Sequence, residues 1–113
     1  REVEMPHPRE LGLNIDFAVA VLDAMSGHDH LMVIAAFRYC LGRMTYIVGD
    51  CADWLIKIWP FLSVQTQNII KRDLEEAFTR DDEDREAGRD YKALGHDCDR
   101  DEWSRVRKLW ENK

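Results

Sequence analysis

Apolar residues that recur every three or four positions, in segments separated by glycine, proline or capping residues, constrain the fold of this chain most. Such spacing puts the apolar side chains on one face of an α-helix, which must then pack against another element. The segments with this spacing are residues 14–25, residues 29–41, residues 46–58, the stretch after Ser63 and the stretch from Asp99. The sequence therefore predicts an all-α protein, a compact bundle of about five helices.

Residues that suit helix ends support this division. Asp29 and Thr45 stand where a helix N-terminus needs a side-chain acceptor, and Gly42 stands where the second helix must end. Asp99 and Glu102 match a capping box, in which the first residue would cap the last helix and the second would reach back to it. The spacing and the caps agree, so we expect helices joined by short connections.

The length suits one domain, residues 1–113. Residues 1–13 are expected to form an N-terminal arm, because Pro6 and Pro8 disfavour helix there. The apolar period is lost over residues 79–98, which we interpret as a charged, partly irregular linker before the last helix, although its acidic start also suits a prolonged fourth helix.

Negative charge is concentrated in one part of the sequence. Residues 73–102 contain thirteen acidic and five basic residues, a net charge of −8, against −6 for the whole chain. Such a field repels phosphate backbones and attracts basic protein surfaces, so we expect a protein partner and no direct contact with nucleic acid. A hydrated surface that only keeps the protein soluble explains the same charges equally well. The carboxylates expected to bind a partner are Asp81, Asp82, Glu83, Asp84, Glu86 and Asp90.

Two short pairs of side chains raise the question of a zinc site. His28 and His30 form one pair, and His96 and Cys98 form the other. Structural zinc sites use such short spacings. Because both pairs adjoin a glycine in a predicted turn, we favour turn residues, and we expect no metal and no cofactor.

The acids Asp97, Asp99 and Asp101 begin like a calcium-binding loop. That loop also needs a glycine at its sixth position and a bidentate glutamate at its twelfth. Here these positions hold Glu102 and Lys108, so the start of a solvated helix is the better interpretation.

No catalytic motif stands out. The sequence contains neither GxSxG nor a glycine-rich phosphate loop. The dipeptides His28-Asp29 and His96-Asp97 resemble those of HD phosphohydrolases, but two dipeptides do not supply that family's ligand set. The basic residues that a helix-turn-helix would need are scattered over separate helices. We therefore predict a non-enzymatic protein with no catalytic residues.

Hydropathy and cysteine usage indicate the compartment. No apolar run approaches the roughly 18 residues that cross a bilayer. Cys40, Cys51 and Cys98 are an odd number without a CxxC pair, which favours a reducing environment. The first two fall among apolar residues of predicted helices, where small buried thiols are the default. We expect a cytoplasmic protein.

The most individual feature is RYCLGRMTYIV at residues 38–48. Physically it predicts two helices that meet at a fixed corner. With the acidic residue that follows, Trp54, Leu55 and a Trp59-Pro60 stop, it resembles small helical accessory proteins of bacteriophages and mobile elements. The resemblance covers about residues 31–60, implies a bacterial host cell as the setting and carries over no catalytic residue.

Small acidic phage proteins without catalytic motifs are often inhibitors of host machinery, and anti-CRISPR proteins are the group that this chain fits best. The phage setting and the acidic stretch together lead us to expect an inhibitor that mimics nucleic acid and occludes a basic surface, such as that of a CRISPR-Cas effector. The alternative is a phage structural or regulatory protein that forms a homodimer through the face of Trp103, Val106 and Trp110 on its last helix.

Overall fold

The computed structural model describes residues 30–41 and 46–111, and this part of the chain contains helices and no strand. Its elements follow one another along the chain as α3 (His30–Cys40), α4 (Tyr46–Ile58), the 3-10 turn η1 (Trp59–Phe61), α5 (Val64–Glu86) and α6 (Asp97–Glu111). The all-α prediction is confirmed. The predicted arm over residues 1–13 and the predicted helix over residues 14–25 lie outside the described residues.

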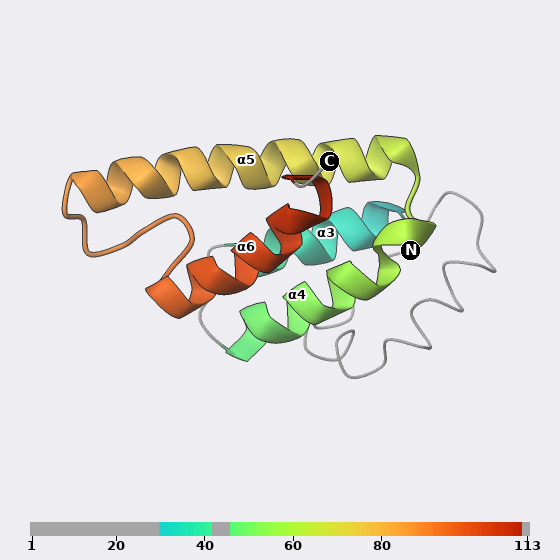
Figure 1. The fold of residues 1–113 in the computed structure, drawn as a ribbon, viewed down its shortest axis with the longest axis horizontal. Coiled ribbons are helices and arrows are strands. Elements are labelled where there is room, and N and C mark those ends of the chain that lie inside the picture. Colours follow the sequence, from blue (N-terminus) through green and yellow to red (C-terminus); the bar gives the residue numbers. More distant parts are fainter. Residues whose placement is uncertain (1–29, 42–45, 112–113) are drawn as a thin grey trace, which may run out of the picture.

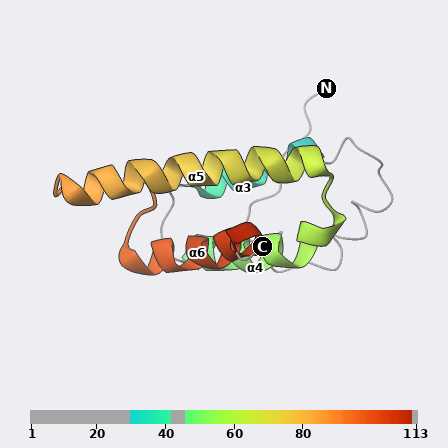
Figure 2. The ribbon, with the colours of Figure 1, turned by 45° about the horizontal axis from the view of Figure 1, so that its top comes forward.

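The four helices form two layers. Figure 2 shows α3 beside α5 in one layer and α4 beside α6 in the other. The helices of each layer run in the same direction, opposite to those of the other layer (Figure 1). The most extensive contact joins α4 to α6. A side chain added at Gly49 of α4 would lie 3.1 Å from Oε2 of Glu102, so the glycine allows this close approach.

The core lies between the layers, where the apolar faces of the helices meet. The rings of Phe37 of α3 and Trp103 of α6 meet edge to face, with 5.5 Å between ring centroids and an interplanar angle of 90°. This edge-to-face arrangement suits the charge distribution of aromatic rings. The largest fully buried side chains include Trp54, Leu55, Ile58, Ile70, Leu74 and Leu94.

Helix α5 (Val64–Glu86) is longer than the linker interpretation of residues 79–98 allows. It begins as expected, because the hydroxyl of Ser63 accepts a hydrogen bond from the backbone N–H of Thr66 at 3.1 Å. It continues to Glu86, so the linker interpretation of residues 79–98 is wrong for its first eight residues, and the alternative of a prolonged fourth helix is confirmed there. The reason is that Asp81, although charged, lies on the inward stripe of the helix and is buried there.

The start of α6 also differs from the expectation. The helix begins at Asp97, and the carboxylate of Asp99 accepts a hydrogen bond from the backbone N–H of His96 at 2.9 Å. Asp99 therefore bonds to the residue before the helix. The sequence had predicted that Glu102 would form this type of bond.

The Trp-rich face of α6 points into the bundle. Trp103 and Val106 are fully buried. Trp110 packs against Trp59 with 5.4 Å between ring centroids, and its Nε1 donates a hydrogen bond to Glu75 at 3.0 Å. The face expected to form a homodimer therefore contacts α5, η1 and the core, and its residues Trp103 and Val106 are not exposed to a second copy of the chain.

Cys40 and Cys51 are buried, as predicted, whereas Cys98 is exposed. A hydrogen bond with Cys40, together with burial, raises the pKa of the Cys51 thiol and keeps it protonated. Among the described helices, none combines the length and the apolar character that crossing a membrane requires.

We predict that Leu74→Ala lowers the free energy of unfolding by about 2 to 5 kcal/mol, because it leaves a cavity in the core. Val64→Ala, on the same helix, removes an exposed side chain and should change it by no more than about 0.5 kcal/mol. Urea denaturation of both variants measures the difference. Equal losses would contradict the inward orientation of Leu74.

Candidate interaction site at the end of α5

A buried carboxylate joins three segments at the end of α5. Asp81 is fully buried. Its Oδ2 accepts hydrogen bonds from Nε of Arg85 at 2.6 Å and from Nη1 of Arg100 at 2.5 Å, and its Oδ1 accepts one from the backbone N–H of Leu94 at 2.9 Å. One side chain therefore connects α5, the α5–α6 loop and α6.

These contacts decide the ionisation of Asp81. Burial raises its pKa, but the hydrogen bonds from Arg85, from the Leu94 N–H and from Arg100 outweigh burial, so the pKa lies below the ordinary value of an aspartate. The carboxylate stays charged inside the protein because both guanidinium groups are also charged.

Asp84, one helical turn further on, holds the loop in a similar way. It accepts hydrogen bonds from Nη1 of Arg89 at 2.5 Å and from the backbone N–H of Ala93 at 2.8 Å. The bond from Arg89 contributes most to lowering the pKa of Asp84. The loop thus returns to α5 at two successive backbone positions, which fixes its path.

The arginines that bind Asp81 have further partners. Arg85 pairs with Asp97 and donates to the carbonyl oxygen of Gly95 at 3.2 Å. Arg100 reaches Asp82 at 2.8 Å, and its guanidinium lies 4.9 Å from the ring centroid of Phe78. Both arginines are therefore committed to partners within the molecule.

The six carboxylates that the sequence singled out all lie at this end of the molecule, but in different environments. Asp81 is fully buried, so it is not accessible to the partner that the sequence predicted it to bind. Asp84 is largely covered, and the mostly exposed Asp82 shares Arg100 with Asp81. The remaining three are exposed, and their side chains form no hydrogen bond or ion pair with another described residue: Glu83, Glu86 and Asp90. We call these three the free carboxylates.

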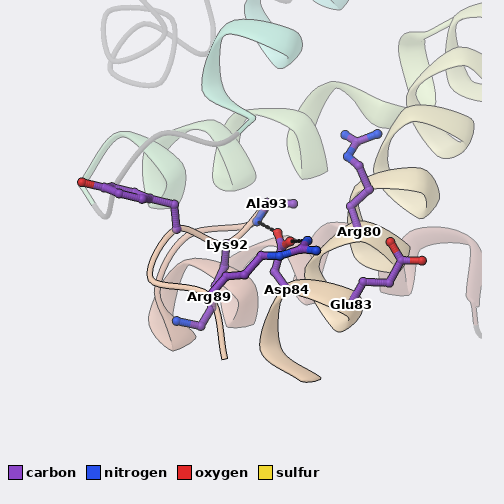
Figure 3. Close-up of a pocket in the computed structure, with 7 residues that line it drawn as sticks. Arg80, Glu83, Asp84, Arg89, Lys92 and Ala93 are labelled. Atoms are coloured by element: carbon purple, nitrogen blue, oxygen red, sulfur yellow. Dashed lines mark hydrogen bonds and ion pairs between the residues drawn. The ribbon is translucent and has the colours of Figure 1, made fainter. Parts of the chain in front are cut away.

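A pocket of about 400 Å³ lies between the end of α5 and the loop. Its lining includes three basic side chains, which the sequence reasoning did not single out. The sequence did contain a signal for them, because they are basic residues within the most acidic stretch of the chain. The lining consists of Arg80, Glu83, Asp84, Arg89, Tyr91, Lys92 and Ala93 (Figure 3).

The two pairs considered for zinc have different outcomes. His28 lies outside the described residues. His96 and Cys98 are exposed, and within the described ranges no three His, Cys, Asp or Glu side chains gather as metal ligands would.

Compared with known proteins, the chain matches no family model, no curated sequence and no solved structure. Its function must therefore be argued from its own residues.

We predict that Asp81→Asn lowers the free energy of unfolding at pH 7 by about 2 to 4 kcal/mol, because two arginines lose their shared anion. Since the pKa of Asp81 is lowered by folding, its contribution is present above the unfolded pKa of about 3.9 and is lost as the pH falls through the folded pKa. The difference between wild type and variant should therefore shrink below about pH 4.

Urea denaturation from pH 7 to pH 3 measures this difference. Glu86→Gln is the control, because Glu86 is exposed and has no partner among the described residues. A difference that stays constant down to pH 3 would contradict the ionised pairing of Asp81.

We also predict that Gly95→Ala destabilises the protein more than Gly88→Ala. Both glycines have positive φ, 80° and 68°, so either alanine costs about 1 to 2 kcal/mol of strain. A Cβ at Gly95 would also lie 2.6 Å from Oδ2 of Asp99, whereas nothing lies within 4 Å of one at Gly88. Thermal and urea denaturation should show at least about 1 kcal/mol of extra loss for Gly95→Ala. Equal losses would show that Asp99 moves away without cost.

Proposed function

We propose that this protein is a non-enzymatic binding protein that attaches to a basic surface of another protein through its free carboxylates, Glu83, Glu86 and Asp90. The observation that supports the proposal is the use of the nearby arginines. Arg85 and Arg100 use their donors on Asp81 and on the exposed Asp97 and Asp82, so they do not pair with the free carboxylates. The free carboxylates keep their charge for a partner.

The position of these acids suits rapid association. Glu83 and Glu86 are three residues apart on the exposed side of α5, and Asp90 follows in the loop. Opposite charges steer the encounter of two proteins, and added salt screens that attraction. The loop is already held by Asp81 and Asp84, so little ordering is required when a partner binds.

The resemblance of residues 31–60 to phage and mobile-element accessory proteins supports a narrower form of the proposal. In that setting the basic surface is one that normally holds nucleic acid, and the protein acts as an anti-CRISPR type of inhibitor by covering it. The net charge of −8 over residues 73–102 suits such mimicry of nucleic acid.

The experiment is a binding assay with a purified type I interference complex at several salt concentrations. The double variant Glu83→Gln/Glu86→Gln should weaken binding roughly two- to thirtyfold at low salt, because exposed ion pairs contribute about 0.2 to 1 kcal/mol each. The difference should decrease as salt rises.

The control variant, Asp53→Asn/Glu111→Gln, changes the net charge equally but alters exposed carboxylates on α4 and at the end of α6. It should bind like the wild type. If the interference complex binds neither the wild type nor the variants, the inhibitor proposal is wrong. If both variants bind as tightly as the wild type at low salt, the free carboxylates are not the contact surface, and a hydrated surface explains them instead.

A further inference from the structure

We infer that the pocket between α5 and the loop binds a phosphomonoester, meaning a phosphate group carried on a small organic molecule. The inference starts from how the basic residues of the acidic stretch are distributed. Residues 73–102 contain five of them, and Arg85 and Arg100 turn inward to Asp81. The other three all line this one pocket: Arg80, Arg89 and Lys92.

The donors of these three side chains are largely available. The side chains of Arg80 and Lys92 form no hydrogen bond or ion pair with another described residue. Arg89 donates a hydrogen bond from Nη1 to Asp84, and the other nitrogens of its guanidinium have no acceptor among the described residues. Figure 3 shows Arg89 reaching back to Asp84, with Arg80 and Lys92 pointing to opposite sides of it, so these two long side chains would turn toward an anion bound between the helix and the loop.

Two carboxylates also line the pocket and must be counted. Asp84 already accepts bonds from Arg89 and from the Ala93 N–H, so it is largely compensated. Glu83 has no such partner and opposes an anion, and Figure 3 shows it directed away from Asp84. Three cations against two carboxylates leave the lining with a net charge of +1, inside a stretch whose net charge is −8.

Charge and shape favour a phosphomonoester over a carboxylate. At neutral pH a phosphomonoester carries between −1.5 and −2 charges and offers three acceptor oxygens, which is roughly twice the charge of a carboxylate. Guanidinium groups bind phosphate oxygens through paired donors.

Size and the position of Tyr91 favour an organic group on the phosphate. A volume of about 400 Å³ falls within the range of small-molecule pockets and exceeds what inorganic phosphate fills. The Tyr91 side chain is 91% exposed, which leaves its ring open to a planar group at the edge of the pocket. Because Asp81 and Asp84 hold the backbone at Leu94 and Ala93, the loop is positioned before a ligand arrives.

The test is an NMR titration of the full chain with phenyl phosphate, inorganic phosphate and benzoate. We expect phenyl phosphate to bind with a dissociation constant of about 1 mM, inorganic phosphate more weakly and benzoate most weakly, with shifts centred on the amides of residues 80–93. Absence of such shifts up to about 10 mM phenyl phosphate would overturn the inference. Benzoate binding as tightly as phenyl phosphate would overturn the choice of phosphate.

The variant Arg80→Gln/Lys92→Gln should weaken phenyl phosphate binding about tenfold or more, because it removes two charged donors. Its control, Lys71→Gln/Arg72→Gln, makes the same change in net charge in the first half of α5 and should bind like the wild type. Equal weakening by both variants would show a general charge effect and overturn the site. The same spectra report whether each variant is folded, and the wild-type titration is decisive alone.

Glu83→Gln separates this inference from the proposed function. The substitution removes the opposing charge from the pocket, so it should tighten phenyl phosphate binding about two- to fivefold. It should weaken binding to a basic protein surface, because it removes a free carboxylate. Tighter phosphate binding without any loss of partner binding would leave the pocket standing and contradict the proposed function. Weaker partner binding without any tightening of phosphate binding would overturn the pocket alone.

Discussion

The ion pairs between the buried Asp81 and the arginines Arg85 and Arg100 determine how the end of this molecule is built. A carboxylate removed from water costs several kcal/mol unless charged donors replace the water. Here two guanidinium groups and the N–H of Leu94 do so. Since these donors come from α5, α6 and the loop, all three segments must be in place together. The length of α5 and the path of the loop are therefore consequences of one buried charge.

The same ion pairs determine which charged side chains at the surface remain without a partner. Arg85 and Arg100 divide their donors between Asp81 in the interior and the exposed acids Asp97 and Asp82. Neither arginine pairs with a free carboxylate, so these three acids remain uncompensated, and the other three basic residues of the stretch line the pocket. The separation of the free carboxylates from the basic residues of the pocket thus follows from the need of the buried Asp81 for charged partners. The proposed binding to a basic protein and the inferred phosphate pocket both depend on it.

The sequence predicts the helices well because their apolar spacing and the Ser63 cap are local signals. It predicts the end of α5 poorly, because a charged residue at position 81 interrupts the apolar period and its partner Arg100 lies nineteen residues away. The same limit applies to Trp103 and Trp110. Their spacing predicts an apolar face on α6, but spacing cannot show whether another helix of the same chain covers that face. The pocket depends on how the loop returns to Asp84, which no local pattern specifies.

Glu83 connects the two proposed activities, because it belongs to the free carboxylates and also lines the pocket. A bound phosphate would add negative charge beside the surface that faces a basic protein. Binding of the phosphate and of the basic partner would then favour each other, and thermodynamic linkage requires the effect to be equal in both directions. Because Glu83 itself lines the pocket, the two binding sites are adjacent. Their coupling would therefore be electrostatic and would decrease with salt, without any change in the positions of the helices. The loop held by Asp81 and Asp84 suits this, since both ligands would meet it already ordered.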